Sequence, residues 1–294
     1  MNLPVMVPGL SRELVRQWCR RIDSGPYSSI AAGERIAFPN PEIMVTLAAA
    51  AAWTERVKVA FHVLVPPMHD PVLLAKQVAT LDVLSGGRVC LGVGVGARQE
   101  DYRAVGATWD SRLLSRLETN VEVMRRVWDG SHAIEGVSRA VQPQPLQRGG
   151  PAILAGVLMP QAITRAAHWA DGITGFSFGP SADDVRMRFE GARAAWKEAG
   201  RTTAPRLVTG FWFALGSDAD EQVGSYLERY LAFMGDGAGR SLAPNISARS
   251  PEALRDALAM CRDLGADEVL LVPTTSAPAE ADRAAEVIAS LPRA

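Results

Sequence analysis

Two glycine-rich motifs could hold a ligand, and the first spans Gly92 to Ala97. It matches the G-x-G-x-x-A pattern of dinucleotide-binding turns. That pattern belongs at the first strand-to-helix turn of a Rossmann unit, whereas here it follows about the fourth predicted strand. The next residues, 98–102, are polar and do not open an apolar helix. We therefore interpret the glycines as a strand end at which a planar ligand can approach the backbone closely.

The second motif, Gly175 to Gly179, fits the G-x-S-x-G nucleophile elbow of α/β-hydrolases. In that fold the serine is followed along the chain by an acid and then by a histidine. The histidines of this chain all precede Ser177: His62, His69, His132 and His168. Chain order thus excludes the hydrolase triad, and Ser177 is either a hydrogen-bond donor at the strand ends or a turn residue.

The titratable residues offer acid–base candidates but no metal site. His62 sits late in a predicted strand, where it would face an active site at the strand ends, and a core histidine is the alternative. The histidines do not have the spacing of metal ligands. The cysteines lie far apart in the sequence: Cys19, Cys90 and Cys261. They predict neither a disulfide framework nor a thiolate metal site.

The composition is that of a globular protein, with 294 residues, 48% of them hydrophobic and 21% charged, and a formal net charge of −1. This charge lacks the basic excess of a dedicated nucleic-acid binder. No stretch approaches the roughly 18 apolar residues of a membrane span, and the start of the chain lacks the order of a signal peptide. We therefore expect a cytoplasmic protein without a nucleic-acid or membrane partner.

A repeated unit of strand, turn and helix must position these residues. Residues 57–65 are apolar and β-branched and predict a strand. Asp70-Pro71 supplies an N-cap and an N1 proline for a helix that continues to about Leu84. Gly86-Gly87 ends that helix, and residues 88–95 predict the next strand. The helical crossover makes the two strands parallel.

The same pattern recurs along the whole chain. Strands are predicted over residues 3–7, 28–32, 57–65, 88–95, 152–155, 172–176, 207–215 and 268–272. Further helices are predicted over residues 40–53, 112–129, 181–200, 250–265 and from Pro278 onward. Eight strands alternating with helices close a (β/α)8 barrel, and we see no linker. We predict an α/β protein with a single TIM-barrel domain over residues 1–294 and insertion loops at its C-terminal face.

Two stretches interrupt this pattern. Residues 131–150 contain the run Gln142-Pro143-Gln144-Pro145, and residues 233–249 contain three glycines without firm periodicity. Long loops in compact domains are often functional. Each stretch is therefore either a lid over the barrel mouth or a solvated loop.

The segment from Glu34 to Gly106 carries several longer runs that together form a family pattern. They are Thr54-Glu55-Arg56-Val57, Asp70-Pro71-Val72-Leu73-Leu74-Ala75-Lys76-Gln77, Leu81-Asp82-Val83-Leu84-Ser85-Gly86-Gly87-Arg88 and Leu91-Gly92-Val93-Gly94-Val95-Gly96. Further matches lie at Arg116, Glu118, Trp128 and over residues 151–156 and 168–172. Over most of its length the chain resembles the bacterial-luciferase-like family of flavin- and F420-dependent oxidoreductases.

The resemblance implies a barrel that often forms dimers, with a flavin or a deazaflavin lying across the C-terminal strand ends. In related F420 enzymes a non-proline cis peptide forms a bulge behind the ring, and the matching bond is His62-Val63. The resemblance then places the ring near Val63, Leu64 and Gly94. The phosphate end would lie at Gly156, Val157, Leu158 and Met159, where Pro160 starts a helix. Further cofactor contacts are expected from Gly96, Arg98 and Ser177.

Candidates for the chemistry follow from this placement. The candidate proton donors are His62, Glu34 and Glu100, and the candidate anion contacts are Arg35 and Arg98. Glu34 and Arg35 follow the second predicted strand, so they reach the mouth unless they form a surface ion pair.

Two positions depart from the family's known chemistries. A catalytic glutamate of sugar-phosphate F420 dehydrogenases falls near Ala97, and the phosphate-binding arginine of true luciferases falls at about Val95. Neither sugar-phosphate oxidation nor aldehyde luminescence is therefore expected.

The favoured function is F420-dependent hydride transfer to or from a small organic substrate, because the chain is short and compact. The first alternative is a two-component FMN-dependent monooxygenase that needs a flavin reductase. The second is a barrel that binds flavin without turnover, because Ala97 removes an obvious acid. A homodimer is expected, and the substrate depends on loops that vary freely on one barrel.

Overall fold

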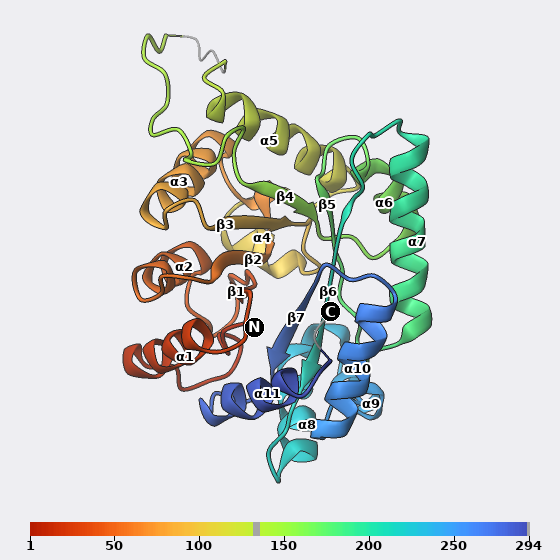
Figure 1. Cartoon of the computed structure of the whole chain (residues 1–294). Coiled ribbons are helices and arrows are strands. Elements are labelled where there is room, and N and C mark those ends of the chain that lie inside the picture. Colours follow the sequence, from red (N-terminus) through yellow and green to blue (C-terminus); the bar gives the residue numbers. More distant parts are fainter. Residues whose placement is uncertain (132–135, 293–294) are drawn as a thin grey trace.

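Parallel strands pair in chain order in the computed structural model of the protein, which describes residues 1–131 and 136–292 (Figure 1). Within these residues the sheet has the order β1-β2-β3-β4-β5-β6-β7, and all neighbours are parallel. The strands are β1 (Ser29–Ala32), β2 (Lys58–Leu64), β3 (Val89–Val93), β4 (Ala152–Ala155), β5 (Gly172–Thr174), β6 (Arg206–Phe213) and β7 (Glu268–Pro273).

The first residues of the chain close this sheet into a barrel. The Asn2 amide donates to the Leu271 carbonyl of β7 over 2.8 Å, and the Leu3 amide donates to the Ala31 carbonyl of β1 over 2.7 Å. This segment therefore occupies the place of an eighth strand between β7 and β1. The predicted (β/α)8 barrel is confirmed.

Helices surround the barrel and begin where local capping signals place them. The side chains of Asp70, Ser181 and Ser250 each accept a hydrogen bond from the third residue of the following helix. The outer helices are α1 (Arg12–Ser24), α2 (Ile43–Ala52), α3 (Pro71–Leu84), α5 (Leu113–Trp128), α6 (Pro160–Ala166), α7 (Ala182–Glu198), α10 (Pro251–Asp263) and α11 (Ala279–Ala289). Across the described ranges, none of the helices combines the length and apolar character that crossing a membrane requires.

Two predicted boundaries are wrong. The strand expected over residues 3–7 is reduced to a bridge at Asn2, because Pro4 has no amide hydrogen and the chain turns there. The helix expected over residues 40–53 begins only at Ile43. Its N-cap is Glu42, whose carboxylate accepts hydrogen bonds from the first free amides of the helix.

Small side chains pack the centre of the barrel. One buried cluster takes one residue from each of six strands: Ala31, Ala60, Cys90, Leu154, Val208 and Leu270. The barrel is therefore a filled core and not a pore. Ligands can bind only beyond this cluster, at the ends of the strands.

The two interruptions lie at opposite ends of the barrel. The Gln147 side chain donates to Asp82 over 2.7 Å and to the Val89 carbonyl over 2.8 Å, at the N-terminal end of β3. The lid alternative is therefore wrong for residues 131–150, whose described part is bound away from the mouth. Residues 132–135, with His132 among them, lie outside the described residues.

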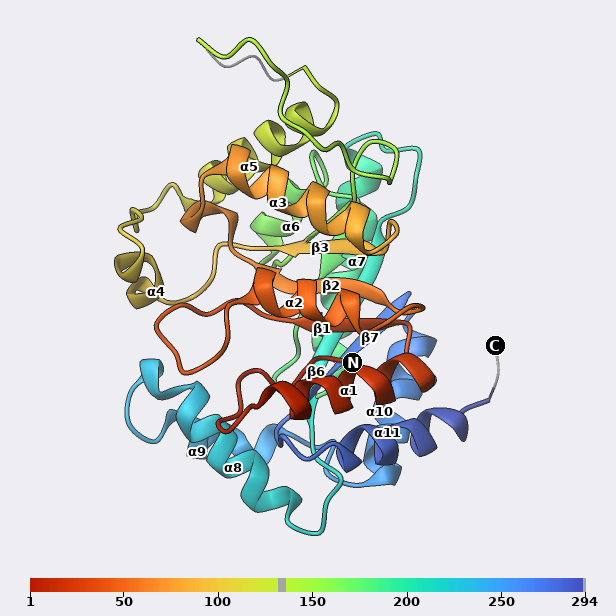
Figure 2. The ribbon, with the colours of Figure 1, turned by 90° about the vertical axis from the view of Figure 1, so that its left-hand side faces the viewer.

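The second interruption belongs to a segment on the mouth side, which we name the cap. The cap follows β6 and comprises α8 (Ala219–Tyr230), η2 (Ala232–Met234), α9 (Ala238–Leu242) and η3 (Ala243–Asn245). In Figure 2 the cap helices lie on the same side of the barrel as α4 (Gln99–Ala104), which follows β3. The lid alternative therefore fits residues 233–249.

Arg88 joins the starts of two strands to the ends of two helices, so its loss tests the stability of this half of the barrel. Its guanidinium donates to the carbonyls of Ser85, Val57 and Thr54 over 2.7–2.8 Å. We expect Arg88→Gln to lower the free energy of unfolding in urea by about 3 kcal/mol, because charge-assisted hydrogen bonds are lost. The control Arg103→Gln, on the exposed face of α4, should change it by less than about 0.5 kcal/mol. Equal losses in both variants would contradict this assignment.

Candidate functional site

The end of β2 departs from regular pairing and directs Val63 into the barrel mouth. The register between β2 and β3 shifts between Phe61 and Leu64, and the His62-Val63 bond is cis, as the family resemblance implies. The Val63 side chain lies against glycines at the ends of β3 and β4: Gly92, Gly94 and Gly156. A Cβ atom on any of them would lie 2.8–3.3 Å from a Val63 methyl carbon. These glycines form a shelf without side chains, which a flat ligand can approach.

His62 lies beside this shelf as a neutral imidazole. Its Nδ1 atom is 3.4 Å from the Asn2 side-chain nitrogen, which can only donate, so Nδ1 accepts and the ring proton sits on Nε2. The ring is 6.2 Å from that of Phe176. Burial lowers the pKa of His62 to about 4, although a hydrogen bond with the Gly175 backbone opposes this shift. His62 therefore carries no charge near neutral pH.

Glu34 joins the ends of β1 and β2. Its carboxylate is 1% exposed, accepts from the Val65 amide over 2.6 Å, and is 2.7 Å from Nε2 of His69. The Glu34 amide donates to the Val63 carbonyl. Burial opposes protonation of His69, but the hydrogen bond and charge of Glu34 outweigh it and raise the pKa of His69. Both carboxylate oxygens of Glu34 are thus engaged, and their contact with His69 favours the protonated form of that ring.

His69 is a functional residue that the sequence alone did not indicate. The available signal was its place between a strand end and the Asp70 N-cap, which put it at the mouth. Its contact with Glu34 joins residues 35 positions apart, and no local pattern predicts that contact. One quarter of the His69 side chain is exposed, so a ligand in the mouth can reach it.

Arg35 forms a buried ion pair with Asp101, and not the surface ion pair that was the alternative for Glu34 and Arg35. Its Nε atom is 2.8 Å from Asp101, and the two side chains are 5% and 8% exposed. The second carboxylate oxygen of Asp101 accepts from the amides of Ile36 and Ala37 over 3.0 and 2.7 Å. The pair therefore fixes the loop after β1 to α4. Sequence reasoning missed Asp101.

Arg98 connects the loop after β3 to the cap. Its Nη2 atom donates to the Tyr230 carbonyl over 3.3 Å, and its Cζ atom lies 4.6 and 4.1 Å from the ring centroids of Tyr230 and Phe233. Trp212 of β6 supports the cap from inside, with its ring centroid 5.8 Å from Tyr230 and 4.6 Å from Phe176. An aromatic wall therefore encloses one side of the mouth.

Several other predicted site residues do not join this constellation. Glu100 is exposed in the first turn of α4. Leu64 is fully buried and its carbonyl accepts from the Gly94 amide, so its side chain faces the core. Gly96 is exposed beside Val65.

Ser177 is a turn residue, which is the second of the two roles that its motif allows. Its side chain is fully buried, and its hydroxyl is hydrogen-bonded to the Gly179 carbonyl and accepts from the Ser181 amide over 3.3 Å. A cofactor in the mouth therefore cannot reach this hydroxyl without opening the turn between β5 and α7.

The segment expected at the cofactor's phosphate end follows β4. Leu158 and Met159 are exposed, whereas Val157 is buried and its amide donates to the Ala155 carbonyl over 3.1 Å. The helix that follows, α6, has only seven residues. The phosphate placement there stays a prediction.

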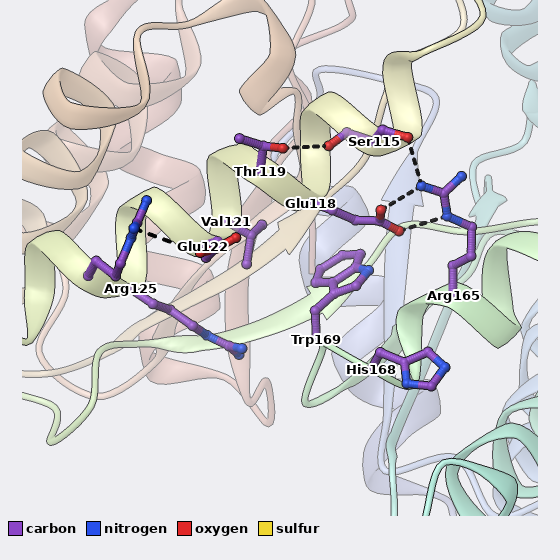
Figure 3. A pocket seen from close by; sticks show the side chains of 10 residues that line it. Ser115, Glu118, Thr119, Val121, Glu122, Arg125, Arg165, His168 and Trp169 are labelled. Carbon is purple, nitrogen blue, oxygen red and sulfur yellow. Dashed lines mark hydrogen bonds and ion pairs between the residues drawn. The ribbon is translucent and has the colours of Figure 1, made fainter. Parts of the chain in front are cut away.

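A large surface groove lies away from the mouth, between α5 and α6 (Figure 3). Figure 3 shows Glu118 of α5 facing Arg165 of α6, whose Nε atom donates to it over 2.8 Å. Trp169 and His168 line the same groove. The opposite charges here are already paired and no strand end reaches the groove, so we do not assign the active site to it.

Among the described residues, no group of three or more histidine, cysteine or acidic side chains is placed to bind a metal ion. Cys19, Cys90 and Cys261 are buried and free.

Comparison with known proteins identifies relatives of this chain. A family model described as luciferase-like monooxygenase matches residues 9–285. An uncharacterized protein of Mycobacterium tuberculosis is 33% identical over 171 residues, which cover 56% of this chain and 59% of that protein. The FMNH(2)-dependent dimethylsulfone monooxygenase of Pseudomonas putida is 29% identical over 214 residues, covering 68% of this chain and 57% of that protein. The chain thus spans less than two thirds of the length of these relatives.

Solved structures show the same fold. Monooxygenase RslO1 from Streptomyces bottropensis superposes with a TM-score of 0.80 at 22% identity, covering 98% of this chain and 96% of that one. The coenzyme F420-dependent tetrahydromethanopterin reductase from Methanopyrus kandleri has a TM-score of 0.76 at 16% identity, covering 99% and 96%. At these identities the likeness establishes the fold.

The pKa values of the two mouth histidines should be shifted in opposite directions from the ordinary value. We expect NMR titration to place the pKa of His62 near 4 and that of His69 above the ordinary value of about 6.5. Between about pH 6.5 and 4 the unfolded chain binds a proton at residue 62 that the folded chain refuses. His62 therefore lowers the free energy of unfolding as the pH falls through this window, by up to about 3 kcal/mol. His62→Gln should remove that dependence, and a His62 midpoint above 6 would contradict the assignment.

Proposed function

The chain belongs to the luciferase-like monooxygenase family, and on that premise we propose that it is an oxidoreductase that binds a flavin-type cofactor across its barrel mouth. The observation that carries the proposal is the glycine shelf under Val63. A Cβ at Gly94 or Gly156 would press on Val63 and on neighbouring backbone oxygens, so side chains there would disturb the surface on which we place the ring. The residues of the mouth therefore fit such a ring.

The residues around the shelf divide into holding and proton-handling groups. Val63, Gly94 and Gly156 would hold the ring. When bound, the cofactor supplies hydride transfer or, in the case of reduced FMN, oxygen activation. The chain orients the cofactor and the substrate, and it supplies a proton. The cap excludes water from the mouth. His69 is suited to hold that proton near neutral pH, because the buried Glu34 carboxylate raises its pKa and part of its ring is exposed.

His62 has a different role in this proposal. Its imidazole is neutral, and Asn2 fixes the tautomer that carries the proton on Nε2. His62 is held by Asn2 and the Gly175 backbone through hydrogen bonds, so it positions its neighbours and does not act as a cationic acid. Glu34 is a positioning residue for His69, since neither of its carboxylate oxygens is free.

F420 is the first cofactor that we propose, with hydride transfer to or from a small organic substrate. The compact chain supports it, as do solved F420 enzymes with the same fold, such as the F420-dependent secondary alcohol dehydrogenase (TM-score 0.75, 16% identity, covering 96% of this chain and 94% of that one). The alternative is an FMN-dependent monooxygenase, which the name of the Pseudomonas putida relative supports. That alternative requires a flavin reductase as partner.

We also propose a single domain that forms a homodimer. Apolar side chains are exposed on the neighbouring helices α2 and α3: Val45, Leu73 and Leu84, which are 70%, 55% and 73% exposed. A second copy of the chain would bury such a surface.

Fluorescence titration of the purified protein with F420 and, separately, with FMN tests the proposed function. We expect dissociation constants in the micromolar range or below for F420 and weaker binding of FMN. The reverse order would favour the monooxygenase alternative. If neither cofactor bound, the proposal would be wrong.

A methyl group on the shelf should block the ring without unfolding the barrel. A Cβ on Gly94 would lie 3.2 Å from a Val63 methyl carbon and 3.3 Å from the Gly156 carbonyl oxygen, so Val63 would have to shift on the shelf. We expect Gly94→Ala to weaken cofactor binding at least tenfold, with little change in melting temperature. The matched control is Gly224→Ala in α8, where a Cβ meets no atom within 4 Å, and it should leave binding unchanged. Unaltered affinity in Gly94→Ala would remove Gly94 from the cofactor site.

A further inference from the structure

We propose that Arg35 and Arg98 form a binding site for the anionic group of the substrate, a carboxylate, sulfonate or phosphate, beneath the cap. The inference rests on the proposed function, because it assigns the substrate to the same mouth. Both arginines lie on loops that leave the C-terminal strand ends, Arg35 after β1 and Arg98 after β3. Asp101 is the carboxylate bonded to Arg35, and Arg98 has no ion-pair partner among the described residues.

The two cations are close enough to disfavour each other. The positive charge of Arg98 lowers the pKa of Arg35, in addition to burial and against the attraction of Asp101. Both guanidinium groups also approach the same ring, since their Cζ atoms lie 5.9 and 4.6 Å from the Tyr230 centroid. Two positive charges with one bonded carboxylate leave a net positive charge in a largely buried place, which an anion would neutralise.

Unused hydrogen-bond donors point to the same ligand. Nη1 of Arg35 and Nε of Arg98 are both buried and have no hydrogen-bond partner. The Arg35 side chain as a whole is only 5% exposed. A buried donor without a partner is costly, and each cost disappears when an acceptor binds. Guanidinium groups present parallel donors that match the paired oxygens of carboxylate, sulfonate or phosphate groups.

The aromatic rings around the arginines define how the anion enters. Arg35 lies 4.6 Å from the ring centroid of Phe38, and Arg98 lies 4.1 Å from that of Phe233. Phe233 and Tyr230 both belong to the cap, so a movement of the cap would carry these rings away from the arginines. The acidic group of a substrate would take the place of these rings beside the arginines. The remainder of the substrate would then extend from the cap toward the shelf.

The position of the pair favours the substrate over the cofactor's phosphate. The shelf extends from Val63 toward Gly156 at the end of β4, where the phosphate is expected. The arginine pair lies on the loops that follow β1 and β3, and not on the segment that follows β4. An anion held there would place the rest of its molecule above the shelf, beside His69.

The test uses methanesulfonate and acetate as probes, followed by NMR through the arginine Nε–H signals at constant ionic strength. We expect saturable shifts at Arg35 and Arg98 in the wild-type protein. Arg98→Gln should weaken the affinity for the probes at least tenfold, and Arg98→Lys, which keeps the charge but loses the fork, should fall between. The control Arg103→Gln should match the wild type. Absence of saturation, or equal affinity in Arg98→Gln, would overturn the proposal.

A second measurement separates substrate from cofactor. The sequence places Arg98 among the cofactor contacts, whereas the substrate assignment predicts that Arg98→Gln binds the phosphate-bearing cofactor as tightly as the wild type does. A loss of cofactor affinity comparable to the loss for the probes would assign the site to the cofactor phosphate and overturn the substrate assignment. If the wild type bound the probes but neither cofactor, the proposed function would fail and the anion site would stand.

Discussion

The mouth of this barrel depends on one carboxylate, that of Glu34. Its two oxygens bind the Val65 amide and the His69 ring, while its own amide binds the Val63 carbonyl. These three contacts join the end of β1 to the irregular end of β2 and fix the direction of Val63. A buried carboxylate is tolerated only when its oxygens are satisfied. The same contacts that satisfy Glu34 therefore create both the shelf and a histidine that holds a proton.

Charge is distributed unequally around this carboxylate. Glu34 with His69, and Arg35 with Asp101, are nearly balanced pairs, whereas Arg98 is held by a backbone carbonyl and aromatic rings. Cation–π contacts are weaker than hydrogen-bonded ion pairs and exchange more readily. The rim after β1 is thus fixed by strong contacts, and the connection to the cap is the weaker one. This division places rigidity at the shelf and adaptability at the entrance.

Much of the architecture could be predicted from local sequence. The caps at Asp70, Ser181 and Ser250 depend on neighbouring residues only, and eight apolar segments sufficed to indicate the barrel. The strand predicted over residues 3–7 is too long, because Pro4 has no amide hydrogen to continue the pairing. For residues 131–150 the sequence leaves a lid and a solvated loop both open, but a loop between a helix and the next strand lies at the opposite end from the mouth.

The site was predicted in part, for a physical reason. His62, Glu34 and Val63 lie at strand ends, and the expected fold brings strand ends together. The partners His69, Asp101 and Tyr230 are joined to the site by contacts across 35, 66 and 132 residues, which no spacing rule reveals.

Closure of the barrel has a kinetic consequence. The bond from Asn2 to Leu271 spans nearly the whole chain, and the Asn2 side chain also positions His62. Contacts of such separation form late, because the entropy of closing the loop must be met first. On the ribosome, Asn2 can take its place between β1 and β7, beside His62, only after β7 has been synthesised. The nascent barrel therefore remains an open sheet, with an incomplete active site, until its last strand arrives.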